Sequence, residues 1–310
     1  MTKPGNRNDG SPGRIAIVGG GISGLATAYF LSESLDPSQA EIVLFESSSL
    51  FGGLIRSEST RNFLWEGGPD SFVSHKPEAL ALCQQMGLEE ELVRTPPRHR
   101  QAYVLCGGEL YPLPMTRSAF VRTPLLSWKG RLRAVLEPLV AVSGQDDESV
   151  SEFVVRRLGR EVSQKIFEPL VVGVYGGDPA QLSIRSTLPH LYQAERSRGS
   201  LTKALLQMVE PLKSKGAGKK KESLVALKEG MAELVRRVVK SLPDRVELRL
   251  QASVSEVTRR EGRFQVQVKG AREDFDTVIL ATPASSSAPL VSSAFPEIAE
   301  ILQGVPYVSA

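Results

Sequence analysis

The chain contains 310 residues, which is long enough for two domains or for one large domain that carries an insertion. Apolar residues make up 41% and charged residues 24%, the ordinary composition of a globular protein. The net charge is +3, from 38 basic and 35 acidic residues, so we expect no nucleic-acid partner, because phosphate binding requires a concentrated basic excess.

The cysteines and the apolar runs bear on the cellular compartment. Cys83 and Cys106 lack the C-x-x-C spacing, so neither a disulfide framework nor a thiol redox site is predicted. No stretch approaches the roughly 18 apolar residues of a membrane-spanning helix. Residues 1–13 are polar and lack the apolar core of a signal peptide, so we expect a disordered lead. We predict a cytoplasmic protein that at most rests peripherally on the inner face of the cell membrane.

The ordered part begins with a βαβ pattern. Residues 15–18 (IAIV) form an apolar run that is typical of a buried parallel strand. Apolar residues then recur at helical spacing from Ile22 to about Ser34, and a second apolar run at residues 42–45 ends at Glu46. A strand, a glycine turn, a helix and a strand within about 30 residues indicate one βαβ unit.

The middle of the chain is mixed and then mainly helical. We interpret residues 50–75 as a glycine-punctuated loop, residues 77–93 as a helix, and residues 103–111 as a hairpin around a Gly-Gly pair. Residues 118–208 are helical in pattern, and residues 213–221 (KSKGAGKKK) are predicted to be a solvated connection.

Further strands follow this middle part. A helix is predicted at residues 231–241, and strand patterns occur at residues 246–250, 264–268 and 277–281. A βαβ opening followed much later by more strands predicts an α/β fold in which one domain carries a helical insertion.

The turn after the first strand carries a dinucleotide-binding motif. The sequence GGGISG fits G-x-G-x-x-G and consists of Gly19, Gly20, Gly21, Ile22, Ser23 and Gly24. The first glycine permits a tight turn, the second lets the backbone approach a pyrophosphate, and the third lets the helix pack closely on the strand. Glu46, at the end of the second strand, is placed to accept hydrogen bonds from both ribose hydroxyls, which disfavours NADP. The alternative is a glycine-rich turn that binds nothing.

The region after Glu46 differs from that of a plain NAD dehydrogenase, in which the next helix would follow. It contains Gly52-Gly53 and then Glu66-Gly67-Gly68-Pro69-Asp70. A long glycine-rich loop suits a backbone that wraps around an extended cofactor, and a purely structural loop is the alternative.

The order of these motifs resembles the flavin amine oxidase superfamily, which includes monoamine oxidases, phytoene desaturases and protoporphyrinogen oxidases. Two later features resemble the protoporphyrinogen oxidase family specifically. These are GPDSF at residues 68–72 and the block FEPLVVGVYGGDPAQLSIRS at residues 167–186, continued by LPHLYQAERSRGS at residues 188–200. The resemblance covers the chain from residue 14 onward.

This resemblance implies FAD as the cofactor, in a Rossmann-like FAD/NAD(P)-binding domain. The G-x-G-x-x-G residues and Glu46 are expected to hold the ADP half, and the backbone of Val254 is expected to meet the adenine. Gly52 and Gly53 should lie along the pyrophosphate. Gly67, Gly68 and Pro69, with Asp70 beside them, should lie near the flavin. Basic residues common in the family are replaced by Leu50 and Leu54, and Arg56 is the expected substitute.

The resemblance also implies substrate contacts. Lys76 is the candidate cation for the propionates of a porphyrinogen, and an exposed lysine without a ligand is the alternative. Gly173 is expected to line the cavity where a side chain would clash with the macrocycle, and a helix break is its alternative. His75, His99 and His190 are too scattered for a metal site, and no acid–base pair is nominated.

The expected domains follow the family. Residues 14–76 and 223–283 are assigned to the FAD-binding domain, and residues 77–115 and 284–310 to an incomplete α+β substrate domain. Residues 116–222 are assigned to a helical domain that contacts membrane. The basic residues available for anionic lipid are Arg117, Arg122, Lys129, Arg131 and Arg133. A solvated helix face is the alternative.

The implied activity is the oxygen-dependent oxidation of protoporphyrinogen IX to protoporphyrin IX in haem synthesis. Oxidation of coproporphyrinogen III is the alternative substrate assignment, while an amine oxidase or a carotenoid desaturase fits the later motifs less well. Family members continue for about 140 further residues, so the chain resembles a C-terminally truncated enzyme, and an inactive nucleotide-binding fragment is the alternative of another class. A homodimer and hand-off of product to the next enzyme of the haem pathway are left open.

Overall fold

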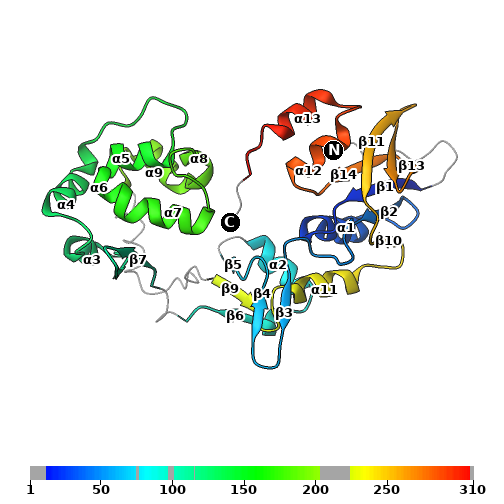
Figure 1. Cartoon of the computed structure of the whole chain (residues 1–310), viewed down its shortest axis with the longest axis horizontal. Coiled ribbons are helices and arrows are strands. Elements are labelled where there is room, and N and C mark those ends of the chain that lie inside the picture. Colours follow the sequence, from blue (N-terminus) through cyan, green and yellow to red (C-terminus); the bar gives the residue numbers. More distant parts are fainter. Residues whose placement is uncertain (1–11, 75–76, 97–100, 115, 203–223, 308–310) are drawn as a thin grey trace. The chain divides into compact units, whose positions relative to one another are not determined.

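The computed structural model describes residues 12–74, 77–96, 101–114, 116–202 and 224–307, and these residues belong to two compact units (Figure 1). The sheet unit comprises the described residues of Met1–Thr95 and Glu222–Tyr307. The helical unit comprises those of Pro96–Lys221. Residues 1–11 of the lead predicted at residues 1–13 and the KSKGAGKKK connection lie outside the described residues, and Gly13 of the predicted lead already belongs to the first strand.

A four-stranded parallel sheet is the centre of the sheet unit. Its strand order is β10-β2-β1-β14, and the register pairs Ile15 of β1 with Ile42 of β2 on one side and with Thr277 of β14 on the other. The strands are β1 (Gly13–Val18), β2 (Ala40–Phe45), β10 (Val246–Arg249) and β14 (Thr277–Leu280). The predicted strands at residues 15–18, 42–45, 246–250 and 277–281 are therefore confirmed.

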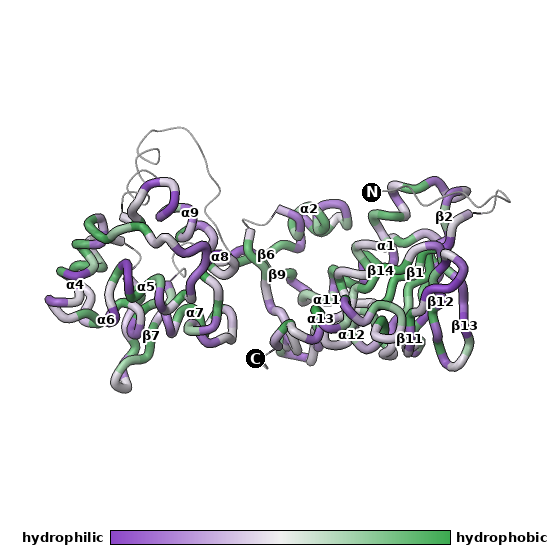
Figure 2. Tube along the Cα trace, turned by 90° about the horizontal axis from the view of Figure 1, so that it is seen from above, coloured by the Kyte–Doolittle hydropathy of each residue, from purple (hydrophilic) through white to green (hydrophobic). Residues whose placement is uncertain are grey.

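Side chains of β1 alternate between two separate cores. Ile15 and Ile17 pack into a core with the helices, whereas Ala16 and Val18 pack into a core with the antiparallel strands that follow β10. Both faces of β1 are thus buried, which explains a continuous apolar run in place of alternation. Figure 2 shows hydrophobic residues gathered along β1 and β14.

Helices cover one face of the sheet and an antiparallel meander covers the other. The helices are α1 (Ile22–Ser34) and α11 (Ala232–Ser241), which confirms the two helices predicted there. The meander consists of β11 (Val254–Arg260), β12 (Arg263–Val268) and β13 (Ala271–Phe275). Two C-terminal helices, α12 (Ala284–Val291) and α13 (Pro296–Gln303), pack on this second core through Val291 and Ala299.

Two predictions for residues 50–93 are wrong in part. The segment interpreted as a loop contains a hairpin of β3 (Ser57–Ser59) and β4 (Leu64–Glu66) and the short strand β5 (Phe72–Val73). The predicted helix at 77–93 ends early, as α2 (Pro77–Gln85), because Gly87 adopts φ +68° and the chain continues through η1 (Glu89–Glu91) into β6 (Leu92–Arg94). β6 and β5 both pair with β9 (Leu224–Leu227), a partner more than 130 residues away that local pattern does not reveal.

The helical unit opens with the predicted hairpin, β7 (Tyr103–Cys106) and β8 (Glu109–Pro112). Its helices surround a core of their own that includes Phe153, Val154 and Ile184. The helices are α3 (Arg117–Arg122), α4 (Trp128–Val135), η3 (Glu137–Leu139), α5 (Val150–Leu158), α6 (Arg160–Val162), the π-helical η4 (Ser163–Phe167), α7 (Glu168–Tyr175), α8 (Ile184–Thr187) and α9 (Pro189–Arg198). The predicted helical insertion is therefore confirmed over the described residues.

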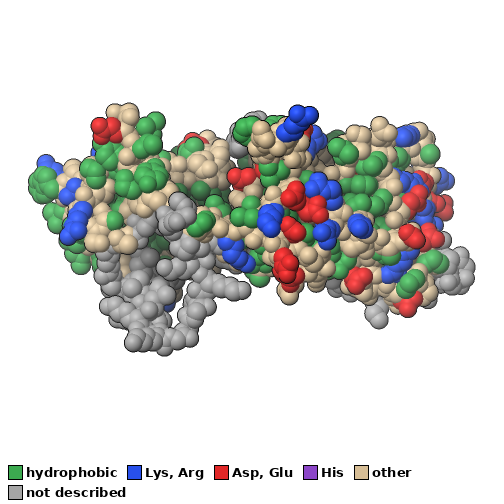
Figure 3. Space-filling view, turned by 90° about the horizontal axis from the view of Figure 1, so that it is seen from below, with side chains coloured by type: hydrophobic (Ala, Val, Ile, Leu, Met, Phe, Trp, Pro, Cys, Tyr) green, Lys and Arg blue, Asp and Glu red, His purple; other side chains and the backbone are tan. Residues whose placement is uncertain are grey.

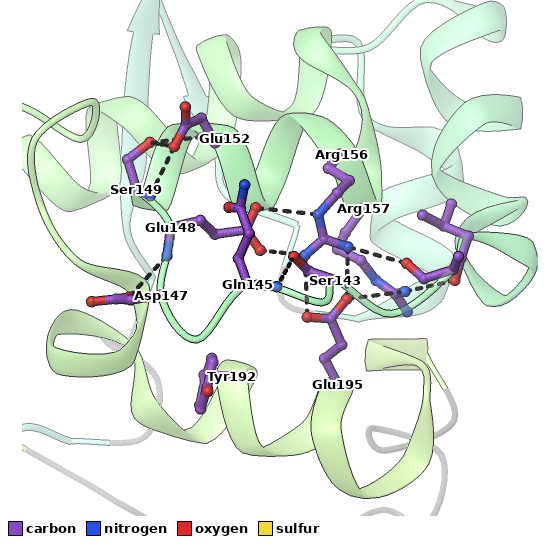
Figure 4. A network of polar contacts seen from close by, with 12 residues as sticks. Ser143, Gln145, Asp147, Glu148, Ser149, Glu152, Arg156, Arg157, Tyr192 and Glu195 are labelled. Carbon is purple, nitrogen blue, oxygen red and sulfur yellow. Dashed lines mark hydrogen bonds and ion pairs between the residues drawn. The ribbon is translucent and has the colours of Figure 1, made fainter.

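A buried ionic network joins the helices of this unit (Figure 4). Arg156 and Arg157, at the end of α5, are adjacent in sequence and share Glu195 of α9 as an acidic partner. Arg156 also pairs with Glu148, and Arg157 also pairs with Glu137 of η3. No helix in the described residues is both long enough and apolar enough to cross a membrane.

Candidate cofactor site

The glycine loop between β1 and α1 has the geometry that its motif predicts. Gly19 adopts φ +109°, which favours glycine, and its amide donates to the Phe45 carbonyl at 2.8 Å. A Cβ on Gly24 would lie 1.9 Å from the Gly19 carbonyl oxygen, so only glycine permits α1 to approach the strand end this closely. Ile22 and Ser23 form the first turn of α1.

Gly21 differs from these two glycines because the space beside it is open. The nearest protein atom to a Cβ on Gly21 would be the Gly53 Cα, at 4.0 Å. The loop is closed on one side by the Gly52 amide, which donates to the Gly20 carbonyl at 2.8 Å. The backbone is therefore exposed at the start of α1 and lined by the turn at Gly52 and Gly53, an arrangement that fits a pyrophosphate.

Glu46 is buried at the end of β2, beside this loop. Its Oε2 accepts from the Gly20 amide at 2.7 Å, and its Oε1 accepts from the Ser48 amide at 2.8 Å. Burial raises the pKa of the Glu46 carboxyl, but the hydrogen bonds from Ser48 and Gly20 outweigh this effect and hold the pKa below its usual value. The carboxylate is ionised at neutral pH and keeps lone pairs free to accept from a ribose.

A cavity of about 250 Å³ lies at the carboxyl ends of β1, β2 and β14. Ligands of open parallel sheets bind at this edge. The cavity brings together Gly19, Glu46 and Val254, three predicted cofactor residues that are far apart in sequence. Its lining is Val18, Gly19, Phe45, Glu46, Ser47, Ala252, Ser253, Val254, Thr282, Ser286 and Leu290.

The second glycine-rich segment packs against the first. The Gly67 amide donates to the Arg56 carbonyl at 2.7 Å, and a Cβ on Gly68 would lie 1.8 Å from the Leu54 carbonyl oxygen. Pro69 and Asp70 follow this contact and are exposed. The segment expected near the flavin is thus held directly on the segment expected along the pyrophosphate.

Arg56 supplies a cation to this region. Its Nε donates to the Gly53 carbonyl at 3.3 Å, so the exposed guanidinium lies beside the Gly52–Gly53 turn. Leu50 and Leu54, which replace the basic residues of the family, are 71% and 79% exposed. The role of Arg56 as the substitute cation stays a prediction.

The two predicted substrate residues, Lys76 and Gly173, are not among the described residues that line the cavity. Lys76 lies outside the described residues, as do His75 and His99. Gly173 belongs to α7 in the helical unit, and no atom lies within 4 Å of where its Cβ would be. The alternative of a helix break at Gly173 is wrong, because α7 continues to Tyr175 and ends where Gly176 adopts φ +65°. No cluster of His, Cys, Asp and Glu that could hold a metal occurs among the described residues.

Sequence reasoning missed Ser47, Ser286 and Leu290 of the cavity lining, and Ser48 beside it. Ser47 and Ser48 bind the Glu46 carboxylate, through a hydroxyl at 3.3 Å and an amide at 2.8 Å. Their position directly after the acidic residue is a local signal that was available. Ser286 and Leu290 of α12 reach the cavity only through the packing of a helix that follows β14, and no local pattern marks them.

Comparisons with known proteins agree with this geometry. The family model described as flavin containing amine oxidoreductase matches residues 22–310. Coproporphyrinogen III oxidase of Bacillus subtilis (strain 168) is 32% identical over 297 residues, which cover 90% of this chain and 61% of that protein. Human protoporphyrinogen oxidase is 32% identical over 322 residues, covering 95% of this chain and 65% of that protein.

Solved structures show the same fold. A protein of Exiguobacterium sp. 255-15, provisionally named a protoporphyrinogen oxidase, is 29% identical, with a TM-score of 0.78 over 93% of this chain and 63% of that one. Cyclohexylamine oxidase of Brevibacterium oxydans IH-35A shares the fold at 15% identity, with a TM-score of 0.60 over 94% of this chain and 63% of that one. The chain spans about three fifths of the length of these relatives. The comparisons support FAD as the cofactor, and the chain belongs to the flavin-containing amine oxidoreductase family.

Proposed function

We propose that the protein is an FAD-dependent porphyrinogen oxidase that converts protoporphyrinogen IX to protoporphyrin IX with molecular oxygen, and that coproporphyrinogen III is the alternative substrate. The observation that carries the cofactor assignment is the cavity that joins Gly19, Glu46 and Val254 at the carboxyl edge of the sheet. The substrate class is supported by relatives named for these two porphyrinogens.

The residues of the chain divide the binding of FAD among them. Glu46 would accept hydrogen bonds from the ribose hydroxyls, and the open backbone at Gly21 would receive the pyrophosphate. Arg56, beside the Gly52–Gly53 turn, would offset part of the phosphate charge. The Gly67–Pro69 segment would form the wall toward the flavin.

When bound, the flavin would supply the redox chemistry in three rounds, each of which removes a hydride and a proton from the porphyrinogen and reduces one oxygen molecule to hydrogen peroxide. The protein contributes orientation and exclusion of water, so no acid–base pair is required of it. We propose that Lys76 binds a propionate of the substrate and that Gly173 leaves room for the macrocycle. Space at Gly173 supports the second role.

Absorption spectroscopy of the purified chain, with and without added FAD, tests the cofactor assignment. Flavin bands that co-purify or appear on titration would support it, and turnover would then be followed by porphyrin fluorescence with each of the two porphyrinogens in parallel. A colourless chain that ignores added FAD would contradict it and would favour the alternative of an inactive fragment. Peroxide release with amines in place of porphyrinogens would assign the activity to an amine oxidase.

We also propose peripheral membrane contact through α4 and η3 of the helical unit. Large apolar side chains are exposed along these elements at Trp128, Leu132, Val135 and Leu139. In Figure 3, hydrophobic and basic side chains lie close together over the helical unit. This composition suits an amphipathic helix that lies in a membrane interface.

The structure corrects the set of basic residues expected to meet lipid. Arg131 donates to the Thr123 carbonyl at 2.8 Å, and Arg133 donates to the Arg157 carbonyl at 3.1 Å, so both guanidinium groups are used inside the unit. Arg122 and Lys129 are exposed and keep the proposed role, whereas the side chain of Arg117 lies outside the described residues. The expected electrostatic attraction is correspondingly smaller.

A further inference from the structure

We propose that Glu66 is a positioning residue of the cofactor site, which holds the Gly67–Pro69 segment and the Gly52–Gly53 turn in register on helix α11. The proposal rests on the proposed binding of FAD for its functional meaning. The contacts of Glu66 lie within the sheet unit and can be tested without the cofactor.

Glu66 and Ser57 together satisfy the first amides of α11. Glu66 Oε1 accepts from the Met231 amide at 2.8 Å, and Glu66 Oε2 accepts from the Ser57 hydroxyl at 2.6 Å. The Ser57 oxygen in turn accepts from the Ala232 amide at 2.9 Å. The N-cap residue Met231 has no side chain able to cap, so α11 depends on a cap supplied from another element.

The cap is built from a cross-strand pair. Ser57 and Glu66 face each other in the register of the β3–β4 hairpin. Gly230 adopts φ +88°, and its Cβ would lie 2.6 Å from the Ser57 Cβ and 3.0 Å from Glu66 Oε1. The turn into α11 is therefore seated directly on the pair, and a negatively charged group at this helix end is favourable.

The same hairpin end carries both glycine-rich segments of the cofactor site. After Glu66, Gly67 continues the ladder onto Arg56, and Gly68 lies on the Leu54 carbonyl. α11 contacts the first turn as well, since a Cβ on Gly52 would lie 3.3 Å from Val235. One helix therefore touches Gly52 with its apolar face and Glu66 with its N-terminus.

Glu66 is thus the polar link among three segments that a cofactor would contact or follow. Without its carboxylate the Met231 amide loses its acceptor and the Ser57 hydroxyl loses the group it donates to, so the hairpin end and α11 would separate. Because Gly67 and Gly68 follow Glu66 directly, their position would change with it. Glu66 itself is assigned no contact with the cofactor.

Hydrogen–deuterium exchange of the full chain tests the link in the absence of ligand. In Glu66→Ala we expect exchange to accelerate by about tenfold in three places together, at residues 52–57, 66–70 and 230–236. Glu66→Gln, which keeps one acceptor, should give an intermediate rate, and Ser57→Ala should reproduce the effect at residues 230–236. Glu58→Gln is the matched control, because Glu58 is exposed on the same hairpin. Faster exchange confined to residues 66–70 would overturn the proposal.

The effect of Glu66 on the cofactor site is tested by the visible circular dichroism of the bound flavin at saturating FAD. We expect Glu66→Gln to alter the dichroism and to raise the Kd for FAD several-fold, whereas Glu58→Gln should match the wild-type chain. Unchanged dichroism in Glu66→Gln would show that Glu66 stabilises the fold without positioning the site. If the wild-type chain binds no FAD, the proposed function fails, while the exchange measurement still decides whether Glu66 links the three segments.

Discussion

At the scale of single residues, the two glycines that flank the start of α1 have opposite surroundings. Gly24 is packed against the Gly19 carbonyl, whereas Gly21 borders open space. The G-x-G-x-x-G motif includes both glycines, but in the structure packing constrains only Gly24, and open space at Gly21 supports its proposed role in binding.

This separation predicts different outcomes for two alanine substitutions. Gly24→Ala should lower the thermal stability of the chain strongly, because the methyl group collides with backbone. Gly21→Ala should leave the melting temperature nearly unchanged and should lower FAD affinity by at least about tenfold, since the methyl group fills the proposed phosphate cradle. Differential scanning fluorimetry and flavin titration measure the two effects. Equal loss of stability in both variants would contradict the assignment.

Glu46 carries a second prediction at this scale. In Glu46→Gln an NH2 group replaces one of the two carboxylate oxygens, which accept hydrogen bonds from the protein and would accept them from the ribose. The free energy of FAD binding should therefore weaken by about 1.5–3 kcal/mol, the range for a hydrogen bond to a charged group. Flavin fluorescence titration measures the change, and Glu33→Gln, an exposed position on α1, is the control. Unaltered affinity in Glu46→Gln would remove Glu46 from the cofactor site.

At the scale of elements, α4 depends on a carboxylate supplied by α6. Glu161 accepts from the Ser127 amide at 2.9 Å and from the Ser127 hydroxyl at 2.7 Å, and its Oε1 pairs with Lys165 at 3.0 Å. The hydrogen bonds from Ser127, with help from Lys165, lower the pKa of Glu161 to about 2. Gly130 permits this approach, because a Cβ there would lie 2.0 Å from Glu161 Oε2.

The lowered pKa of Glu161 gives stability a defined dependence on pH. A carboxyl whose pKa is lower in the folded state stabilises the fold above its unfolded value, here 4.5, and this contribution is lost as the pH falls toward about 2. Glu161→Gln should therefore lower the free energy of unfolding at pH 7. It should also weaken the decrease of that free energy as the pH falls below 4.5. Urea unfolding between pH 2 and 7, monitored by far-UV circular dichroism, tests this; a variant with the wild-type profile would contradict it.

The buried ionic network of α5, η3 and α9 predicts a larger loss of stability. Glu137 and Arg157 are both fully buried, and Glu137 also accepts from the Ser200 hydroxyl at 2.7 Å and the Leu201 amide at 2.9 Å. Burial raises the pKa of Glu137, but these hydrogen bonds outweigh it and keep the pKa below its usual value. Without Glu137, the buried Arg157 keeps only its ion pair with Glu195 at 3.3 Å, which Glu195 shares with Arg156, so the Arg157 charge is poorly compensated.

We therefore expect Glu137→Ala to destabilise the helical unit by about 3–5 kcal/mol. The double variant Glu137→Leu with Arg157→Met should lose less stability than the sum of the losses in the Glu137→Leu and Arg157→Met single variants, because only the double variant removes both charges of the pair. Denaturant unfolding of the three variants gives the coupling energy. Additive losses would show that the two side chains act independently.

At the scale of the whole molecule, the exposed apolar residues of the helical unit predict membrane binding. The chain should sediment with vesicles that contain anionic lipid, and Leu132→Glu with Val135→Glu should reduce the bound fraction severalfold without a change in FAD affinity. Glu substitutions at Leu105 and Leu110, exposed on the β7–β8 hairpin, are the control. Equal sedimentation of both double variants would place the membrane contact elsewhere or exclude it.

Local pattern was sufficient where neighbouring residues decide the structure. The apolar runs of β1 and β2, the helical spacing from Ile22 to Ser34 and the Gly107–Gly108 hairpin all depend on contacts close in sequence, and the structure confirms them. Local pattern failed at residues 92–94, since β6 becomes a strand only by pairing with a distant β9. It also failed at residues 57–59 and 64–66, because β3 and β4 pair with each other but are only three residues long, too short to show a strand period.

The sequence by itself determined the βαβ unit, the glycine turn, the acidic residue at the end of β2 and, by resemblance, the flavin-containing family. Each follows from residue type and spacing, because a turn with positive φ favours glycine and a strand buried on both faces favours a continuous apolar run. Only the tertiary structure decided that Val254 and Ser286 share a cavity with Glu46, that Arg131 and Arg133 point into their own unit, and that Glu66 caps α11. The hydrogen bond of Arg131 spans only eight residues, but the other contacts join segments that are far apart in sequence. The physical reason is that a hydrogen bond or a shared cavity leaves no periodic trace in the segments that it joins.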